Sequence, residues 1–192
     1  MPDELSFKKI YPYFILFAIL FFSSGASGYF YAQSHPEMAS ESFNTLSQQF
    51  EVIEEFHPLL IFLFIFFNNS VKALIATATG LFFGLSPIFF ITFNGYIIGL
   101  VVYVGGANIG ADQILMRLIP HGIFEVPAIL LACSYGLWTG KQFYRRTIRK
   151  EDISIKSTLL KASYKCLRVV FPLLLVAAVV ETFITPLIAG IV

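Results

Sequence analysis

Charged side chains are scarce in this chain. Only 13% of its residues are Asp, Glu, Lys or Arg, whereas 57% are hydrophobic and 22 of the 192 are phenylalanine. A water-soluble domain carries about twice that charged fraction. The net charge of +1 gives no basic face for nucleic acid, because the basic residues gather in one segment. The composition therefore predicts an integral membrane protein that lies in a lipid bilayer and binds no nucleic acid.

Cysteines and catalytic motifs are also few. Cys133 lies in an apolar run and Cys166 lies beside a basic one, so their spacing favours neither a disulfide nor a thiolate metal site. No glycine-rich loop for phosphate is present in the sequence, and Ser86 and Ser134 have no matching base. Nucleotide-dependent and serine-nucleophile mechanisms are therefore disfavoured.

Long apolar runs are abundant, and a helix needs about 20 such residues to cross a bilayer. We predict an all-α bundle formed by a single integral membrane domain, residues 1–192, with five spans at about 11–31, 58–79, 81–104, 120–140 and 168–190. The second and third spans form one apolar stretch that small residues divide near Gly80. The first span could instead be a cleavable signal peptide, since Lys8 and Lys9 precede its apolar core, but its length favours a retained span.

Basic residues predict the orientation of the spans, because they accumulate in cytoplasmic loops. Lys8 and Lys9 precede the first span, and nine basic residues lie between Lys141 and Arg168. The connection 32–56 has no Lys or Arg but carries five glutamates. We therefore expect a multi-pass protein of the plasma membrane with its amino terminus in the cytoplasm and its carboxyl terminus outside.

Both long connections have helical periodicity. In 40–56, Phe43, Leu46, Phe50 and Ile53 recur at three- and four-residue steps among acidic residues, which predicts an amphipathic helix at the outer surface. In the segment 141–168, apolar and basic residues alternate. That pattern is typical of a cytoplasmic helix at an anionic lipid surface.

Three ionisable residues interrupt the apolar spans: His121 and Glu125 in the run PHGIFEVPAILLA, and Glu181 in the run VVETFITP. Ionisable groups inside a membrane are energetically expensive and are by default functional. His121 and Glu125 are four residues apart, so they share one face of a helix. At 1.5 Å per residue, Glu125 and Glu181 both lie about 10 Å below the outer surface.

The same depth count brings polar groups from two further spans to this layer. Asn94 lies at about 10 Å and Asn68 at about 15 Å, and Asn69 adjoins Asn68 as further support for the site. Lys72 lies one turn deeper, where it either snorkels toward the cytoplasm, the favoured interpretation, or pairs with an acid.

Prolines and glycines predict local features of the helices around this layer. Pro120 suits the first turn of a helix, Gly122 permits close backbone approach, and Pro127 should bend the helix and free the carbonyl of Ile123. Two glycine pairs at four-residue spacing also predict close helix packing within the membrane. They are Gly80 with Gly84 and Gly95 with Gly99.

Three interpretations of the polar residues remain open. The asparagines, the histidine and the carboxylates could form a hydrogen-bonded core that fixes helix register, or a pathway for protons or ions. Alternatively, His121, Glu125 and Glu181 bind a divalent metal; the three ligands suit zinc with a fourth position open for water, and also manganese or iron, with zinc expected. Such a metal could support hydrolysis near the outer leaflet, with Glu125 as a possible catalytic group. The chain lacks the HExxH motif of metalloproteases.

The runs FFNNSVKA, GLFFGLSPIFFITFNGYIIG, PHGIFEVPAILLACSYG and ETFITP, in this order, resemble the stage II sporulation protein M family over about residues 60–190. The resemblance implies a small polytopic membrane protein of unsettled chemistry, associated in spore formers with engulfment and peptidoglycan-degrading partners. It thereby adds a non-catalytic scaffold for membrane or envelope proteins as an alternative, and a homodimer is plausible. The shared polar motif falls on Asn68, Asn94, Gly95, Pro120, His121, Gly122, Glu125, Glu181 and Pro186.

Overall fold

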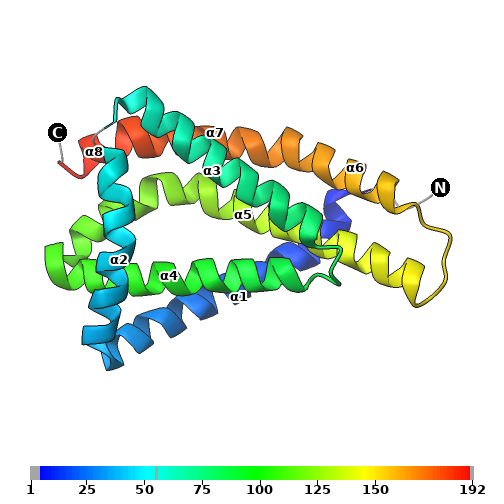
Figure 1. Ribbon diagram of the computed structural model, residues 1–192, viewed down its shortest axis with the longest axis horizontal. Coiled ribbons are helices and arrows are strands. Elements are labelled where there is room, and N and C mark those ends of the chain that lie inside the picture. Colours follow the sequence, from blue (N-terminus) through cyan, green and yellow to red (C-terminus); the bar gives the residue numbers. More distant parts are fainter. Residues whose placement is uncertain (1–4, 55, 191–192) are drawn as a thin grey trace.

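The chain is mostly helical in the part that the structure describes, residues 5–54 and 56–190 of a computed structural model. The helices are α1 (Phe7–Ser34), α2 (Pro36–Glu54), α3 (Pro58–Thr79), α4 (Leu85–Ile109), α5 (Ala111–Thr147), α6 (Ile155–Lys165), α7 (Phe171–Val179) and α8 (Thr185–Ile188). Two π-helical turns, η1 (Cys166–Val170) and η2 (Val180–Ile184), join α6, α7 and α8 into one continuous rod (Figure 1).

Five helical segments are long and apolar enough to cross a membrane: α1, α3, α4, α5 and the rod Ile155–Ile188. They confirm the predicted all-α architecture with five candidate spans. Their outward side chains are apolar and exposed, as in Phe22, Phe67 and Phe89. That distribution is expected where lipid tails cover the surface.

The short connections differ from the prediction at residues 105–119, which we expected to be a loop. A single residue, Gly110, joins α4 to α5, and its φ of +98° lies in a region that side-chain-bearing residues rarely adopt. The helix of the fourth span therefore begins at Ala111, and not at Pro120, where we predicted its first turn. The polar side chains of this first part lowered its hydropathy but did not prevent a helix.

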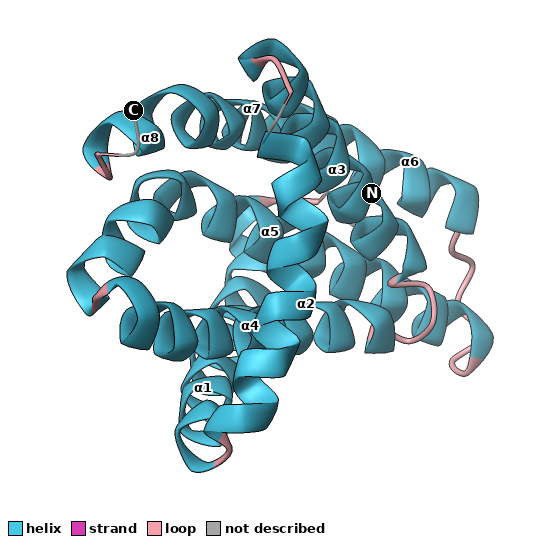
Figure 2. Cartoon of the chain, turned by 60° about the vertical axis from the view of Figure 1, so that its left-hand side comes forward, coloured by secondary structure: helices cyan, strands magenta, loops and turns pink. Residues whose placement is uncertain are grey.

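Pro120 and Pro127 both lie inside α5, and not at its start. The helix curves over this stretch (Figures 1 and 2), as the loss of two backbone donors predicts. A Cβ built on Gly122 would meet no atom within 4 Å. The predicted close backbone approach at Gly122 is therefore wrong.

Glycines allow a close backbone contact between α1 and α4. A Cβ on Gly28 would overlap the carbonyl of Tyr96, and a Cβ on Gly99 would overlap the carbonyl of Gly25. This confirms close packing at the Gly95 and Gly99 pair. At the other end of α4, the chain reverses at residues 80–84, which confirms the division near Gly80.

Helix α2 crosses one end of the bundle, which we term the α2 end (Figure 2). Its Ala39 is fully buried against Ala32 of α1 and against Leu100 and Val104 of α4, and Phe43 packs on this cluster. The predicted amphipathic helix in 32–56 is confirmed, although the side chains of Leu46, Phe50 and Ile53 lie outside the described residues.

The predicted helix in 141–168 is present as α6 (Ile155–Lys165), and it continues through η1 into α7. Helix α5 extends to Thr147, and the last rod begins at Ile155, so each span simply continues beyond the apolar run. Arg145 forms an ion pair with Glu151 at 2.5 Å, and Arg146 donates a hydrogen bond to the carbonyl of Ile153. These two contacts brace the short connection from within.

Both π turns precede a proline by one or two residues. In η1, the N–H of Phe171 donates to the carbonyl of Cys166, and Pro172 follows; in η2, the N–H of Thr185 donates to Val180, and Pro186 follows. A proline has no N–H and clashes with the carbonyl four residues earlier. The wider turn relieves that clash without ending the helix.

Candidate functional site

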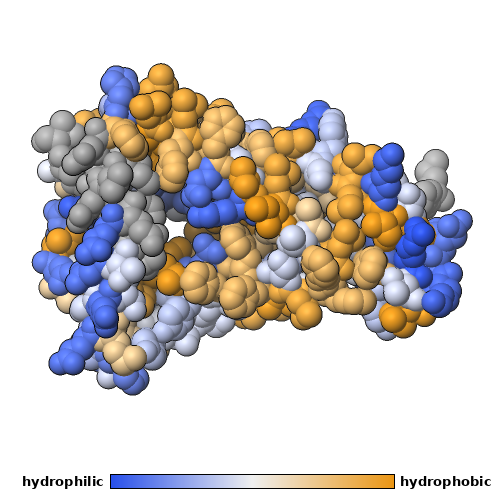
Figure 3. Space-filling model, viewed as in Figure 1, coloured by the Kyte–Doolittle hydropathy of each residue, from blue (hydrophilic) through white to orange (hydrophobic). Residues whose placement is uncertain are grey.

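Helices α3 and α4 diverge from their tight turn toward the α2 end, and a cavity of about 930 Å³ lies between them (Figure 1). Helix α5, η2 and α8 complete its wall. Hydrophilic residues lie beside a hollow between the left-hand end and the hydrophobic middle of the surface (Figure 3). The fold therefore holds a cleft with polar lining residues among the apolar helices.

Four-residue spacing directs one stripe of α5 toward this cleft. Arg117, Glu125 and Ile129 line the cavity, and His121 lies on the same stripe between them. Residues four apart occupy one helix face. The predicted pairing of His121 with Glu125 is present, with 3.9 Å between Nε2 of the imidazole and Oε2 of the carboxylate.

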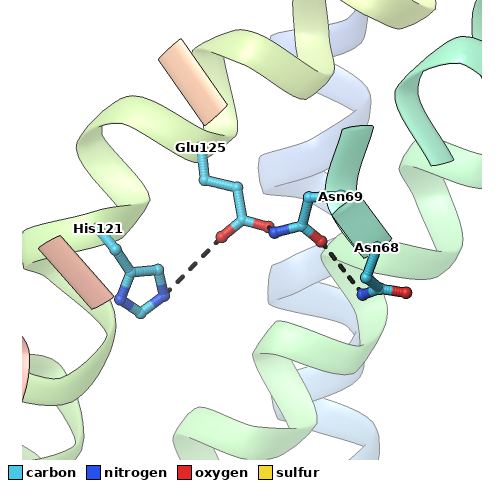
Figure 4. A network of polar contacts seen from close by, with 4 residues as sticks. All are labelled: Asn68, Asn69, His121 and Glu125. Atoms are coloured by element: carbon cyan, nitrogen blue, oxygen red, sulfur yellow. Dashed lines mark hydrogen bonds and ion pairs between the residues drawn. The ribbon is translucent and has the colours of Figure 1, made fainter. Parts of the chain in front are cut away.

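Asn69 of α3 holds Glu125 from the opposite wall. Its Nδ2 donates a hydrogen bond of 2.9 Å to Oε1 of Glu125, and Nδ2 of Asn68 lies 3.4 Å from Oδ1 of Asn69 (Figure 4). Both asparagines line the cavity. Asn69 is thus the direct partner of the carboxylate, and Asn68 stands behind it.

Glu181 enters the cluster from the π turn η2. One ligand atom each from His121, Glu125 and Glu181 lies within 4.8 Å of the other two. The charges of the two glutamates interact. Three groups from two helices thus converge on a volume that one cation could fill.

The histidine in this cluster lacks a hydrogen-bond partner among the described residues. Its Nδ1 is buried and has none, and the 3.9 Å from Nε2 to Glu125 is too long for a hydrogen bond. Buried polar atoms are almost always satisfied. The imidazole therefore keeps a buried nitrogen without a partner in this part of the structure.

Asn94 and Lys72 border the same cavity from α4 and α3. Asn94 uses its Nδ2 to donate 2.7 Å to the carbonyl of Phe90, which leaves its Oδ1 for other partners. The charge of Lys72 interacts with that of Glu125. The structure thus brings all six predicted site residues, together with Lys72, into or beside one cleft.

A family model described as stage II sporulation protein M matches residues 17–186. The chain belongs to the stage II sporulation protein M family. The match begins within α1 and ends at Pro186, so it contains every residue that lines the cleft except Leu187. The resemblance predicted from the runs around Asn68, His121 and Glu181 is confirmed.

Two curated relatives of this stage II sporulation protein M family member come from Methanocaldococcus jannaschii. The chain is 28% identical to the uncharacterized protein MJ0793 over 64% of its length and 32% identical to the uncharacterized protein MJ0706 over 69%. The alignments span 69% and 59% of those two proteins. No solved structure matches the chain.

Arg117 is the cleft residue that the sequence analysis missed in this family member. It precedes His121 by four residues and Glu125 by eight, so the same helical spacing identifies it. The misplaced start of the fourth span at Pro120 excluded it. The π turn that carries Glu181 has no comparable sequence signal apart from the proline that follows it.

Proposed function

We propose that His121, Glu125 and Glu181 bind one divalent cation, with zinc as the expected metal, and that the site uses it for hydrolysis. The observation that carries this proposal is the convergence of three ligand atoms within 4.8 Å of one another. Ligands around a tetrahedral zinc stand about 3.4 Å apart, since each bond is about 2.1 Å. A change of rotamer in the glutamate side chains would shorten the separation of the ligand atoms from at most 4.8 Å to this value.

Electrostatics support a cation at this point. Two carboxylates close together in a low-dielectric region repel each other, and a divalent ion between them relieves that repulsion. The hydrogen bond from Asn69 fixes Oε1 of Glu125 and leaves Oε2 on the side of His121. Such an outer partner orients a ligand and tunes its basicity.

One imidazole and two carboxylates leave a coordination position open for water. When bound, zinc supplies a nucleophilic hydroxide near neutral pH and polarises a carbonyl or phosphoryl oxygen. The protein's own side chains complete the site. Asn69 orients Glu125, Asn94 orients the substrate, and the apolar wall excludes bulk water. Hydrolysis of a substrate within reach of the membrane is the reaction class that this arrangement supports.

Elemental analysis of the purified protein tests metal binding. We expect about one divalent ion per chain, and a loss of nearly all of it in the variant His121→Ala/Glu125→Ala, which lacks two of the three ligands. The matched control is His35→Ala/Glu37→Ala, which removes the same residue types from exposed positions at and beside the start of α2. Equal metal content in both variants would refute the site, and an absence of metal from all three proteins would favour a purely hydrogen-bonded core.

The proposal places the cleft in the outer half of the plasma membrane, with the α2 end outside. Single cysteines test this orientation in a background that lacks Cys133 and Cys166. We expect an impermeant maleimide to label Asn44→Cys in intact cells and Asp152→Cys only after permeabilisation, since both positions are exposed. The reverse pattern would invert the topology and place the cleft in the inner half.

A further inference from the structure

The cavity is far larger than a metal site requires. An ion with a few waters needs about 100 Å³, at about 30 Å³ per water, whereas this cavity holds about 930 Å³. Ligand pockets for small organic molecules fall in the range of about 300–1,000 Å³. Its wall runs along α3 from Pro58 to Lys72, which corresponds to about 21 Å of helix. The occupant is therefore an extended molecule.

The walls divide this cavity into a polar floor and an apolar border. The floor carries Asn69, Glu125 and Glu181, whereas Phe64 and Leu187 belong to the border. These two apolar side chains are 47% and 67% exposed. They lie on helices whose outer surfaces face lipid, so the cleft opens sideways between α3 and α4 (Figure 3). An amphiphile matches this division, with its head on the floor and its chain at the border.

Two cations indicate the charge of the head. Lys72 lines the deep end, and Arg117 lines the cavity from the first part of α5. The Nε of Arg117 is buried and has no hydrogen-bond partner among the described residues. A buried guanidinium nitrogen is costly without an acceptor, and the planar fork of arginine binds phosphate oxygens in pairs.

We propose that this cleft binds the phosphate-bearing headgroup of a membrane lipid, with Arg117 and Lys72 as the groups that recognise the phosphate. This inference rests on the proposed metal site, because a bound divalent cation makes the net charge of the cleft positive. Lys72, Arg117 and the ion together exceed Glu125 and Glu181 by two unit charges; without the ion, the four side chains cancel. Lipid binding therefore depends on the metal, whereas metal binding does not depend on the two basic residues.

Native mass spectrometry of the full chain, with metal content measured in parallel, tests the proposal. The probes are dioleoyl phosphatidic acid, dioleoylglycerol and inorganic phosphate. We expect retention of phosphatidic acid, at least 10-fold weaker retention of dioleoylglycerol, and at least 10-fold weaker retention of phosphatidic acid after chelation. Competition by inorganic phosphate as effective as that by the lipid would assign the site to free phosphate and overturn the proposal.

Variants separate this inference from the metal site itself. Arg117→Gln and Lys72→Met should each weaken phosphatidic acid retention at least 10-fold and keep their metal. The matched control is Arg168→Gln. Arg168 is an exposed arginine in η1, where it donates a hydrogen bond to Tyr164, so this variant should retain the lipid.

If Arg117→Gln does not fold, then Arg117→Lys, which keeps the charge but not the fork, should give an intermediate loss. Metal-loaded protein that retains both dioleoyl lipids equally would overturn the lipid inference alone. Retention of phosphatidic acid that chelation leaves unchanged would overturn the dependence of the lipid site on the metal, and purified protein that contains no metal would overturn the metal proposal.

Discussion

Glu181→Gln is expected to lower the affinity for a divalent cation more than 100-fold. Loss of an outer partner of a metal ligand already costs about 10–100-fold, and this substitution removes a charged ligand outright. The amide keeps the size and shape of the side chain, so the packing of η2 is preserved. Isothermal titration with zinc on metal-stripped protein in detergent measures the change.

Thermal stability gives a second readout of Glu181→Gln. The substitution should raise the melting temperature of the metal-free protein and lower that of the metal-loaded protein. Without metal, the variant should be the more stable protein, because the repulsion between Glu125 and Glu181 is gone. With metal at 100 times its dissociation constant, the wild-type protein gains about 2.7 kcal/mol. That free energy corresponds to roughly 5–10 °C in melting temperature for a chain of this size.

Thr182→Val is the matched control, because Thr182 lies in the same π turn and also lines the cavity. Thr182 is not one of the three ligands, and valine keeps the shape of threonine without the buried Oγ1, which has no hydrogen-bond partner among the described residues, so zinc affinity should be unchanged and stability equal or slightly higher. A melting temperature of the wild-type protein that does not respond to chelation, together with unchanged zinc affinity in Glu181→Gln, would contradict the assignment of Glu181 as a ligand.

Gly99→Ala is expected to prevent the correct packing of α1 on α4. The added methyl group would overlap the backbone carbonyl of Gly25, and backbone cannot move aside as a side chain can. Overpacking a core costs about 1–3 kcal/mol even where side chains absorb it, so the loss here should be at the upper end or beyond. Fluorescence-detected size-exclusion chromatography after heating should show a sharp fall in the folded fraction.

Gly122→Ala controls for the general effect of glycine replacement in a membrane helix. It lies in α5, and no atom is within 4 Å of the added Cβ, so we expect a neutral or slightly stabilising effect, since alanine has the higher helix propensity. Equal losses in Gly99→Ala and Gly122→Ala would indicate that helix propensity, and not the contact between α1 and α4, controls the folded fraction.

Hydropathy predicted the number and order of the spans but not where they end. Helices α4 and α5 continue through Gly105 to Ile119 with only Gly110 between them, although Asp112 and Arg117 lower the hydropathy there. Hydropathy reports which residues tolerate lipid, whereas helix continuity depends on backbone hydrogen bonds. A polar extension of a span is therefore invisible to the criterion that finds the span.

Counting residues along each span predicted the depth of the polar layer, but it could not predict which way each polar side chain points around its helix axis. Asn68 and Asn69 differ by about 1.5 Å in height and about 100° in azimuth, and only the packing of α3 makes Asn69 the donor to Glu125. The azimuth of Glu181 depends in addition on a wider turn at Val180–Ile184. Its proximity to His121 thus followed from the tertiary structure and not from residue counting.

The glycine contact between α1 and α4 also constrains the order in which the protein is built. Residues 35–84 separate the two helices, and at about 5–20 residues per second a ribosome needs roughly 3–10 s to synthesise them. During that interval the surface at Gly25 and Gly28 has no helix to fill it. Nascent α1 must therefore rest against lipid or against the insertion machinery until its partner arrives, so cotranslational assembly of this protein begins with a delay set by α2 and α3.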